Sequence, residues 1–206
     1  TRGVTADAKN YWTQASSLTG YYAWRAKDAL NPPSQNAIYA LARYAMGNDA
    51  DRAEFEKWLA GWSRDVRSNV STLDPATKSD IHFKRGAELV RLDRTVEARR
   101  DFATLVEEKK DDARALYALA LYLRDSNLYS LALDCGEKIA RLATAAGASD
   151  APRFLWQLRF PTYYADLVVP ESQKNNLDPL IYFALLRQES SFNPWSTSSA
   201  DARGLG

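Results

Sequence analysis

The sequence predicts an all-α protein, built over most of its length from stacked helical hairpins. Glycine and proline are scarce, with 9 and 8 among 206 residues, and they cluster between apolar segments as helix boundaries. No segment keeps a period-two alternation over several residues, the pattern that indicates strands. A shift of 34 residues brings apolar positions in the middle of the chain into register, which indicates a repeated helical unit.

Composition excludes several classes of function. The 27 basic and 26 acidic side chains leave a net charge of +1. The chain therefore lacks the strong positive charge that would indicate a nucleic-acid partner. No apolar run is long enough for a transmembrane segment. With Cys135 as the single cysteine no internal disulfide can form, and with His82 as the single histidine we expect no metal site. The start Thr1–Gly3 is not a signal peptide, so we expect any targeting segment to lie outside the chain or to have been removed.

Helix boundaries are marked by capping residues and by breaks. Residues 31–34 (Asn-Pro-Pro-Ser) form a break, after which Ser34 can cap a helix that runs through Tyr39 and Ala45 and ends at Gly47. Asp74-Pro75 and Asp178-Pro179 each place a capping carboxylate before a proline at the first helical position, where its missing N–H costs nothing. Each pair predicts a helix start.

The 34-residue shift is the period of tetratricopeptide-type (TPR-like) hairpins, in which a small alanine lets paired helices approach closely. It superimposes Ala98 on Ala132, Leu89 on Leu123 and Leu105 on Ile139. Most consensus Trp, Gly, Tyr and Pro positions are absent, so we expect a superhelix of irregular helix pairs.

Aromatic residues are concentrated in the first third of the chain. Two roles stay open for them: they fill gaps between helices, which is the commoner use, or some line an inner surface and stack against sugar rings. The residues are Trp12, Tyr21, Tyr22, Trp24, Trp58 and Trp62.

A change of character between Gly147 and Pro161 predicts a domain boundary. Residues 147–152 and 160–162 are both loop signals, and a helix is expected from Tyr163 to Lys174. We therefore divide the chain into a helical superhelical domain, residues 1–158, and a C-terminal domain, residues 159–206.

The helix expected to follow Asp178 carries the residue of greatest interest, Glu189. At about 100° per residue, Glu189 shares an arc with apolar side chains that include Ile181 and Leu185, while Arg187 falls on the opposite side. Desolvation and the negative end of the helix dipole would both favour the protonated carboxyl group, the form in which a general acid acts. The alternative is an ordinary glutamate that ends an apolar stripe and reaches solvent.

The motif around this residue resembles the opening signature of the soluble lytic transglycosylases. It consists of Arg187-Gln188-Glu189-Ser190, then Phe192-Asn193-Pro194, then Ser198 nine residues after Glu189, and finally Ala202-Arg203-Gly204-Leu205, with no gap in the spacing. Phe160-Pro161 with Tyr163 and Tyr164, and Leu177-Asp178-Pro179, resemble the family's approach to this helix. Residues 21–26 (Tyr-Tyr-Ala-Trp-Arg-Ala) resemble a recurring piece of its superhelix.

The resemblance implies a fold, a reaction and a place of action. It implies that residues 159–206 are the first, truncated part of a lysozyme-like transglycosylase domain. Glu189 would protonate the bond between N-acetylmuramic acid and N-acetylglucosamine, then act as a base so that the muramoyl 6-hydroxyl closes on its own anomeric carbon and leaves a 1,6-anhydro end. No metal or organic cofactor is implied. The substrate implies the bacterial periplasm or cell exterior.

The same resemblance suggests partners and two further site residues. The partners are the glycan strands and, through the superhelix, cell-wall synthesis or division proteins. Ser198 would hydrogen-bond the substrate, although a turn serine is equally consistent with its Ser/Thr-rich surroundings. Ser190 would bind substrate or orient Glu189, and a helix-end role is favoured for it. Gly204 suits a positive φ.

The sequence departs from the family pattern at two positions, and it stops before the last residue of that pattern. Asp201 stands where the family usually has glycine, and Gly206 where it usually has methionine. The expected glutamine would come next. We therefore expect the 206-residue chain by itself to have little activity, because a partial domain would not hold Glu189 accurately enough.

Two other functions stay open from the sequence. A helical stack can be a binding or scaffold module with a concave surface. A hydrolytic, lysozyme-like muramidase could use Glu189 with water, but it would need a second carboxylate, and Asp201 is the only acid soon after it.

Overall fold

The protein is all-α, as the sequence predicts. The computed structural model describes residues 6–18, 21–63, 70–148, 150–197, 201 and 203–205. Among these residues no β-strand occurs, and the only extended pairing is an antiparallel bridge between Thr197 and Arg203. No helix among them is long and apolar enough to cross a membrane. Contacts divide the chain into two compact units, Thr1–Arg43 and Tyr44–Gly206, and the boundary predicted at residues 158/159 stays a prediction.

The first unit holds α1 (Ala6–Ser16), α2 (Tyr21–Leu30) and α3 (Gln35–Ile38). Ser34 caps α3 as predicted, because its hydroxyl accepts a hydrogen bond from the amide of Ala37 at 3.2 Å. The side chains of Tyr21, Tyr22 and Trp24 lie outside the described part of the structure, so the two roles left open for them stay open.

The expected continuous helix from Ser34 to Gly47 is wrong. α3 ends at Ile38, and a short 3₁₀ helix, η1 (Leu41–Tyr44), follows it. Within the second unit, the Thr162 hydroxyl donates to the carbonyl of Tyr44 at 2.7 Å, and the Thr162 amide lies 3.4 Å from the Met46 sulfur. Tyr44 and Met46, which were expected inside that helix, thus contact a residue more than a hundred positions away, and local pattern does not reveal such contacts.

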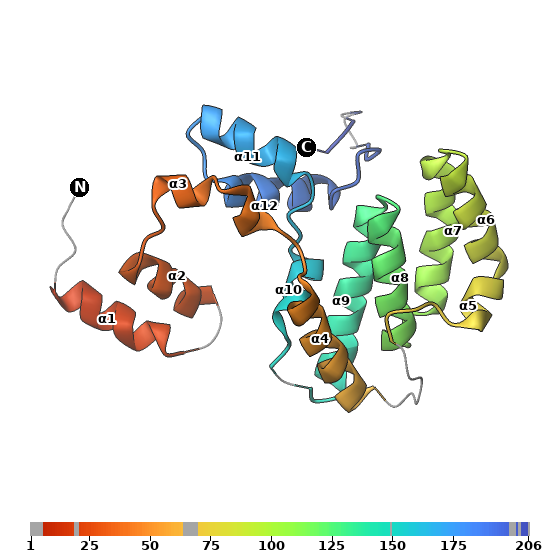
Figure 1. Ribbon diagram of the computed structural model, residues 1–206, viewed down its shortest axis with the longest axis horizontal. Coiled ribbons are helices and arrows are strands. Elements are labelled where there is room, and N and C mark those ends of the chain that lie inside the picture. The colour runs from red at the N-terminus through yellow and green to blue at the C-terminus, as the bar shows by residue number, and fades with distance from the viewer. Residues whose placement is uncertain are drawn as a thin grey trace. The chain divides into compact units, whose positions relative to one another are not determined.

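Two helical hairpins lie side by side in the second unit (Figure 1). The first pairs α6 with α7, the second pairs α8 with α9, and α7 also contacts α9, so the hairpins stack. Among the described residues of this unit, α4 and α5 precede the hairpins, and three helices follow them. The bounds of the second unit's helices are α4 (Asp49–Trp62), α5 (Pro75–Ser79), α6 (Ile81–Arg91), α7 (Thr95–Glu108), α8 (Ala113–Asp125), α9 (Tyr129–Ala145), α10 (Arg153–Arg159), α11 (Ala165–Lys174) and α12 (Pro179–Ser190).

The turns of the two hairpins repeat at a spacing of 34 residues. Asp93 and Asn127 both adopt the left-handed conformation, with φ of 57° and 59°. The following amides bond five residues back, Arg94 to Leu89 and Leu128 to Leu123, each at 2.8 Å. Each turn is therefore the same αL-terminated helix end, and the sequence shift corresponds to a real repeat of backbone geometry.

Small residues set how closely the helices approach. Ala98 and Ala132, the pair predicted to do so, are both fully buried. Two glycines allow still closer contact: a Cβ on Gly86 of α6 would lie 2.8 Å from the Phe102 ring of α7, and one on Gly136 of α9 would lie 3.0 Å from Leu158 of α10. The α6–α7 interface therefore has no room for a methyl group at Gly86, and a methyl group at Gly136 would require α10 to shift.

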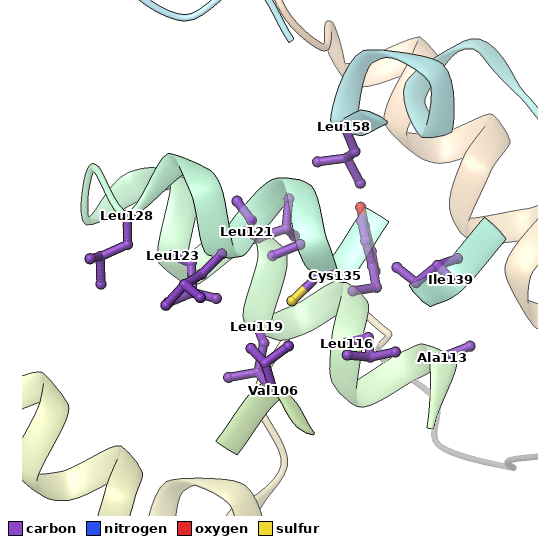
Figure 2. Packing of buried hydrophobic residues seen from close by; sticks show 14 of the residues in the cluster. Val106, Ala113, Leu116, Leu119, Leu121, Leu123, Leu128, Cys135, Ile139 and Leu158 are labelled. Carbon is purple, nitrogen blue, oxygen red and sulfur yellow. The ribbon is translucent and has the colours of Figure 1, made fainter. Parts of the chain in front are cut away.

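The main hydrophobic core is formed by side chains of α4, α7, α8, α9 and α10. Figure 2 shows some of its side chains, among them Val106 of α7, Leu119 of α8, Cys135 of α9 and Leu158 of α10. Trp58 and Trp62 of α4 are partly buried and pack against this core, with ring centroids 5.4 Å apart. For these two tryptophans the gap-filling role holds.

We predict that Gly86→Ala destabilises the protein, because the new methyl group meets a fully buried Phe102 ring that has nowhere to move. The expected loss of unfolding free energy is about 1–3 kcal/mol, measured by urea denaturation. Gly61→Ala is the matched control: its Cβ meets nothing within 4 Å in α4, so we expect a gain of up to about 1 kcal/mol. Equal effects of the two substitutions would contradict this account.

A second prediction concerns Asp101, a buried carboxylate of α7 that accepts hydrogen bonds from Arg85 (Nε, 2.7 Å) and His82 (Nδ1, 2.9 Å). The Arg85 hydrogen bond lowers the pKa of Asp101 despite its desolvation, and His82 adds to the lowering. A lowered pKa stabilises the fold above the unfolded-state pKa of about 3.9, and this contribution is lost as the pH falls through the folded-state pKa. Asp101→Asn should therefore reduce the unfolding free energy at pH 7, and the difference from wild type should shrink below about pH 4. A difference independent of pH would refute this role.

Candidate active site

The helix that carries Glu189, α12, begins at the predicted Asp-Pro signature. The Asp178 carboxylate accepts a hydrogen bond from the Leu180 amide at 2.9 Å, and Pro179 occupies the first turn. The helix ends at Ser190, one residue after Glu189. Glu189 thus lies in the last turn of its helix, as predicted, and α12 packs beside α11 (Figure 1).

The two long faces of α12 differ in exposure. Phe183, Leu186 and Ser190 are buried, whereas Ile181 and Leu185 are 67% and 48% exposed. Glu189 lies with the exposed set. Glu189 is therefore exposed, and the burial that we expected for it is wrong. The reason is that α12 is apolar on both faces, so periodicity alone cannot tell which one packs inward.

The residues just after α12 hold a strained but well-anchored turn. Ser191 and Phe192 both adopt positive φ, 52° and 61°, which is costly for side chains other than glycine. Phe192 is fully buried, and its ring meets that of Tyr163 edge-on at 5.6 Å. Tyr163 in turn stacks on Tyr129 of α9 at 4.0 Å. Burial of Phe192 offsets the backbone strain and ties this end of α12 to the helical stack.

A charge network holds the middle of α12. Arg187 donates from Nη2 to the Glu137 carboxylate of α9 at 2.8 Å and from Nε to the carbonyl of Arg159 at 2.8 Å. The other Glu137 oxygen accepts from Nε of Arg159 at 3.1 Å. The Arg187 guanidinium lies over the Phe160 ring, 4.7 Å from its centroid. We call these four residues, Glu137, Arg159, Phe160 and Arg187, the Glu137 clamp.

A further contact anchors the start of α12. The Phe183 ring packs against Tyr44, with centroids 5.5 Å apart. Sequence reasoning did not single out Tyr44 or Glu137. Glu137 lies 50 residues before Arg187, and no local pattern marks such a pair. Phe160 and Tyr163 were noticed in a loop signal, at an expected helix start and in the family resemblance, but not as contacts of α12.

The loop after the helix is closed by backbone contacts. Thr197 pairs with Arg203, and the Gly204 amide donates to the Ser196 carbonyl at 3.0 Å. Gly204 has a φ of 123°, which confirms the predicted positive φ. Asp201, at the family's glycine position, also has a positive φ, 59°. Aspartate tolerates this conformation better than most residues, so the departure fits the same turn.

Of the two serines proposed as site residues, the structure describes Ser190 but not Ser198. The buried Ser190 hydroxyl donates to the Leu186 carbonyl at 3.1 Å, a contact within the helix. Ser198 lies outside the described residues. Substrate binding by either serine stays a prediction. Across the described part of the chain, no group of three or more His, Cys, Asp or Glu side chains could hold a metal ion.

Comparison with known proteins finds a family model and a solved structure that are similar to parts of this chain or to most of it. Residues 166–206 match the family model described as the transglycosylase SLT domain. A similar solved structure is the lytic transglycosylase Slt of Pseudomonas aeruginosa, an inactive mutant, at 22% identity and a TM-score of 0.48. That match covers 97% of this chain, and this chain spans 32% of that one. No curated protein matches the chain.

The matched segment begins in α11 and contains α12, Glu189 and the loop after it, which are the residues on which the predicted resemblance rests. The family match therefore supports the resemblance predicted from the sequence: residues 166–206 of this chain are similar to the transglycosylase SLT domain of the soluble lytic transglycosylases.

Proposed function

We propose that the protein is a peptidoglycan lytic transglycosylase in which Glu189 acts first as acid and then as base. The observation that carries the proposal is the position of Glu189: an exposed carboxylate at the end of an anchored helix, within the segment that matches the SLT family. An exposed carboxylate can reach a bound glycan, and its anchored helix limits how far it moves.

The proposed reaction needs only one carboxyl group. Protonated Glu189 gives its proton to the glycosidic oxygen as the bond to the muramoyl anomeric carbon breaks. The carboxylate then takes the proton of the muramoyl 6-hydroxyl, whose oxygen bonds to the same anomeric carbon. The product carries a 1,6-anhydro end, no water is consumed, and Glu189 returns to its starting state.

The exposed neighbours of Glu189 suit this task. Ile181, Tyr182 and Leu185 are apolar and at least 42% exposed, and they lie on α12 before Glu189. A glycan bound over this face would displace water from around the carboxyl group, so that the proton transfer takes place away from bulk solvent. In this proposal Ser198 hydrogen-bonds the substrate, and Ser190 acts through the helix end.

The proposed substrate also sets the surroundings in which the protein works. Cleavage of cell-wall glycan places it in the bacterial periplasm or at the cell exterior. Its main partner is the glycan strand, and the helical stack offers a surface for proteins of cell-wall synthesis or division. We also propose that this stack is TPR-like, on the support of the 34-residue repeat of its hairpin turns.

The proposal predicts that Glu189→Gln in the full natural protein abolishes release of 1,6-anhydromuropeptides from purified peptidoglycan. Loss of the acid and base should lower the rate by about 10²- to 10⁴-fold. The measurement is mass spectrometry of the soluble products. Glu171→Gln is the matched control, because Glu171 is an exposed acid on the neighbouring α11 whose ion pair among the described residues is local, with Lys174.

Three results would argue against the proposal in different ways. Products with reducing ends would indicate a hydrolytic muramidase. Unchanged anhydro products from Glu189→Gln would remove Glu189 from the chemistry. No products from the wild-type protein would favour a helical scaffold that binds without cleaving.

A further inference from the structure

The Glu137 clamp joins three helices through one carboxylate. Glu137 lies in α9, Arg159 ends α10, and Arg187 lies in α12. Both Glu137 oxygens are used, one by each guanidinium group. The three side chains are 24–30% exposed, so solvent screens these charges less than it screens fully exposed pairs.

The clamp is directional, whereas the other anchors of α12 are not. Phe183 and Phe192 hold the helix by ring contacts, which tolerate small slides and rotations. Arg187 is fixed by two hydrogen bonds that leave its planar guanidinium group at defined angles. The clamp therefore sets the rotation of α12 about its axis and its shift along that axis.

Rotation of α12 moves Glu189 directly. Arg187 and Glu189 are two residues apart in one helix, about 200° around the axis. The clamp grips one side of the helix, and Glu189 projects from the other. A displacement of about 1 Å at a catalytic group can cost about 10²-fold in rate, so a small shift at Arg187 matters.

We propose that Glu137 is a positioning residue for Glu189 and acts through Arg187 and Arg159. This inference rests on the proposed function of Glu189. It assigns a role in catalysis to a residue of the helical stack that lies outside the segment matching the SLT family. The stack then does more than support the site, because one of its carboxylates sets the angle at which the acid meets the glycan.

The test compares Glu137→Gln with a matched control, Glu107→Gln, in the full natural protein. Glu107 is also a carboxylate that bridges two cations of the stack, Lys110 and Lys138, but it has no contact with α10 or α12 among the described contacts. The readouts are kcat and KM for release of anhydro products, and amide hydrogen exchange of the peptide covering residues 183–190.

We expect Glu137→Gln to lower kcat at least tenfold with KM changed less than about threefold, because the glycan still binds while the acid is misplaced. Exchange of residues 183–190 should become faster in this variant, and thermal unfolding should change little. Glu107→Gln should leave both readouts at the wild-type level. The double variant Glu137→Gln/Arg187→Gln should be no slower than Arg187→Gln, since the two residues act as one unit.

Several results would overturn the positioning role. These are a wild-type kcat for Glu137→Gln, an equal loss in the Glu107→Gln control, or additive losses in the double variant. Failure of the proposed function is distinguishable, because the hydrogen-exchange comparison needs no activity. If the wild type releases no anhydro products while Glu137→Gln still loosens residues 183–190, the proposed function fails and the clamp remains only a structural contact.

Discussion

The anchoring of α12 on the helical stack is the constraint on which the candidate site depends. Three contacts provide it: Phe183 on Tyr44, Arg187 on Glu137 and the Arg159 carbonyl, and Phe192 on Tyr163. Their partners all precede residue 166, where the SLT match begins. These three anchors of the helix with the proposed catalytic residue therefore come from a part of the chain that the family match does not include, whereas α11, which also packs against α12, lies within the match.

In this arrangement the two faces of α12 have different roles. The inward face is buried and carries the anchors, and the outward face carries Glu189 among exposed apolar residues. Two successive left-handed residues, Ser191 and Phe192, turn the chain sharply at the end of the helix. The fully buried Phe192 ring stabilises that turn, so backbone strain beside Glu189 is supported by packing.

Much of the fold followed from local chemistry. The cap residues Ser34, Asp74 and Asp178 mark true helix starts, because a side-chain oxygen bonding a free amide is a short-range effect. The 34-residue shift corresponds to matching turns at Asp93 and Asn127. By contrast, the helix expected from Ser34 to Gly47 is interrupted. Near the end of that segment, Tyr44 and Met46 contact Thr162, more than a hundred residues away in the sequence.

The candidate site was predictable only in part. The motif identified Glu189 and its place in the last turn of α12, because the spacing of residues along a helix determines the directions in which their side chains project. It could not identify the exposed face, because α12 is apolar on both sides. Nor could it identify Glu137, since the pairing of Glu137 with Arg187 depends on how α9 and α12 pack together. Long-range partners of this kind leave no trace in a local pattern.

The account rests on α12 being seated against the stack in solution, and nuclear Overhauser contacts between aromatic rings test this most directly. With phenylalanine and tyrosine rings selectively labelled, we expect cross-peaks between Phe192 and Tyr163 and between Phe183 and Tyr44, whose centroids lie 5.6 and 5.5 Å apart. Detection of both pairs would support the anchoring of α12 at its two ends. Their absence, in a spectrum that shows the Tyr129–Tyr163 contact at 4.0 Å, would contradict it.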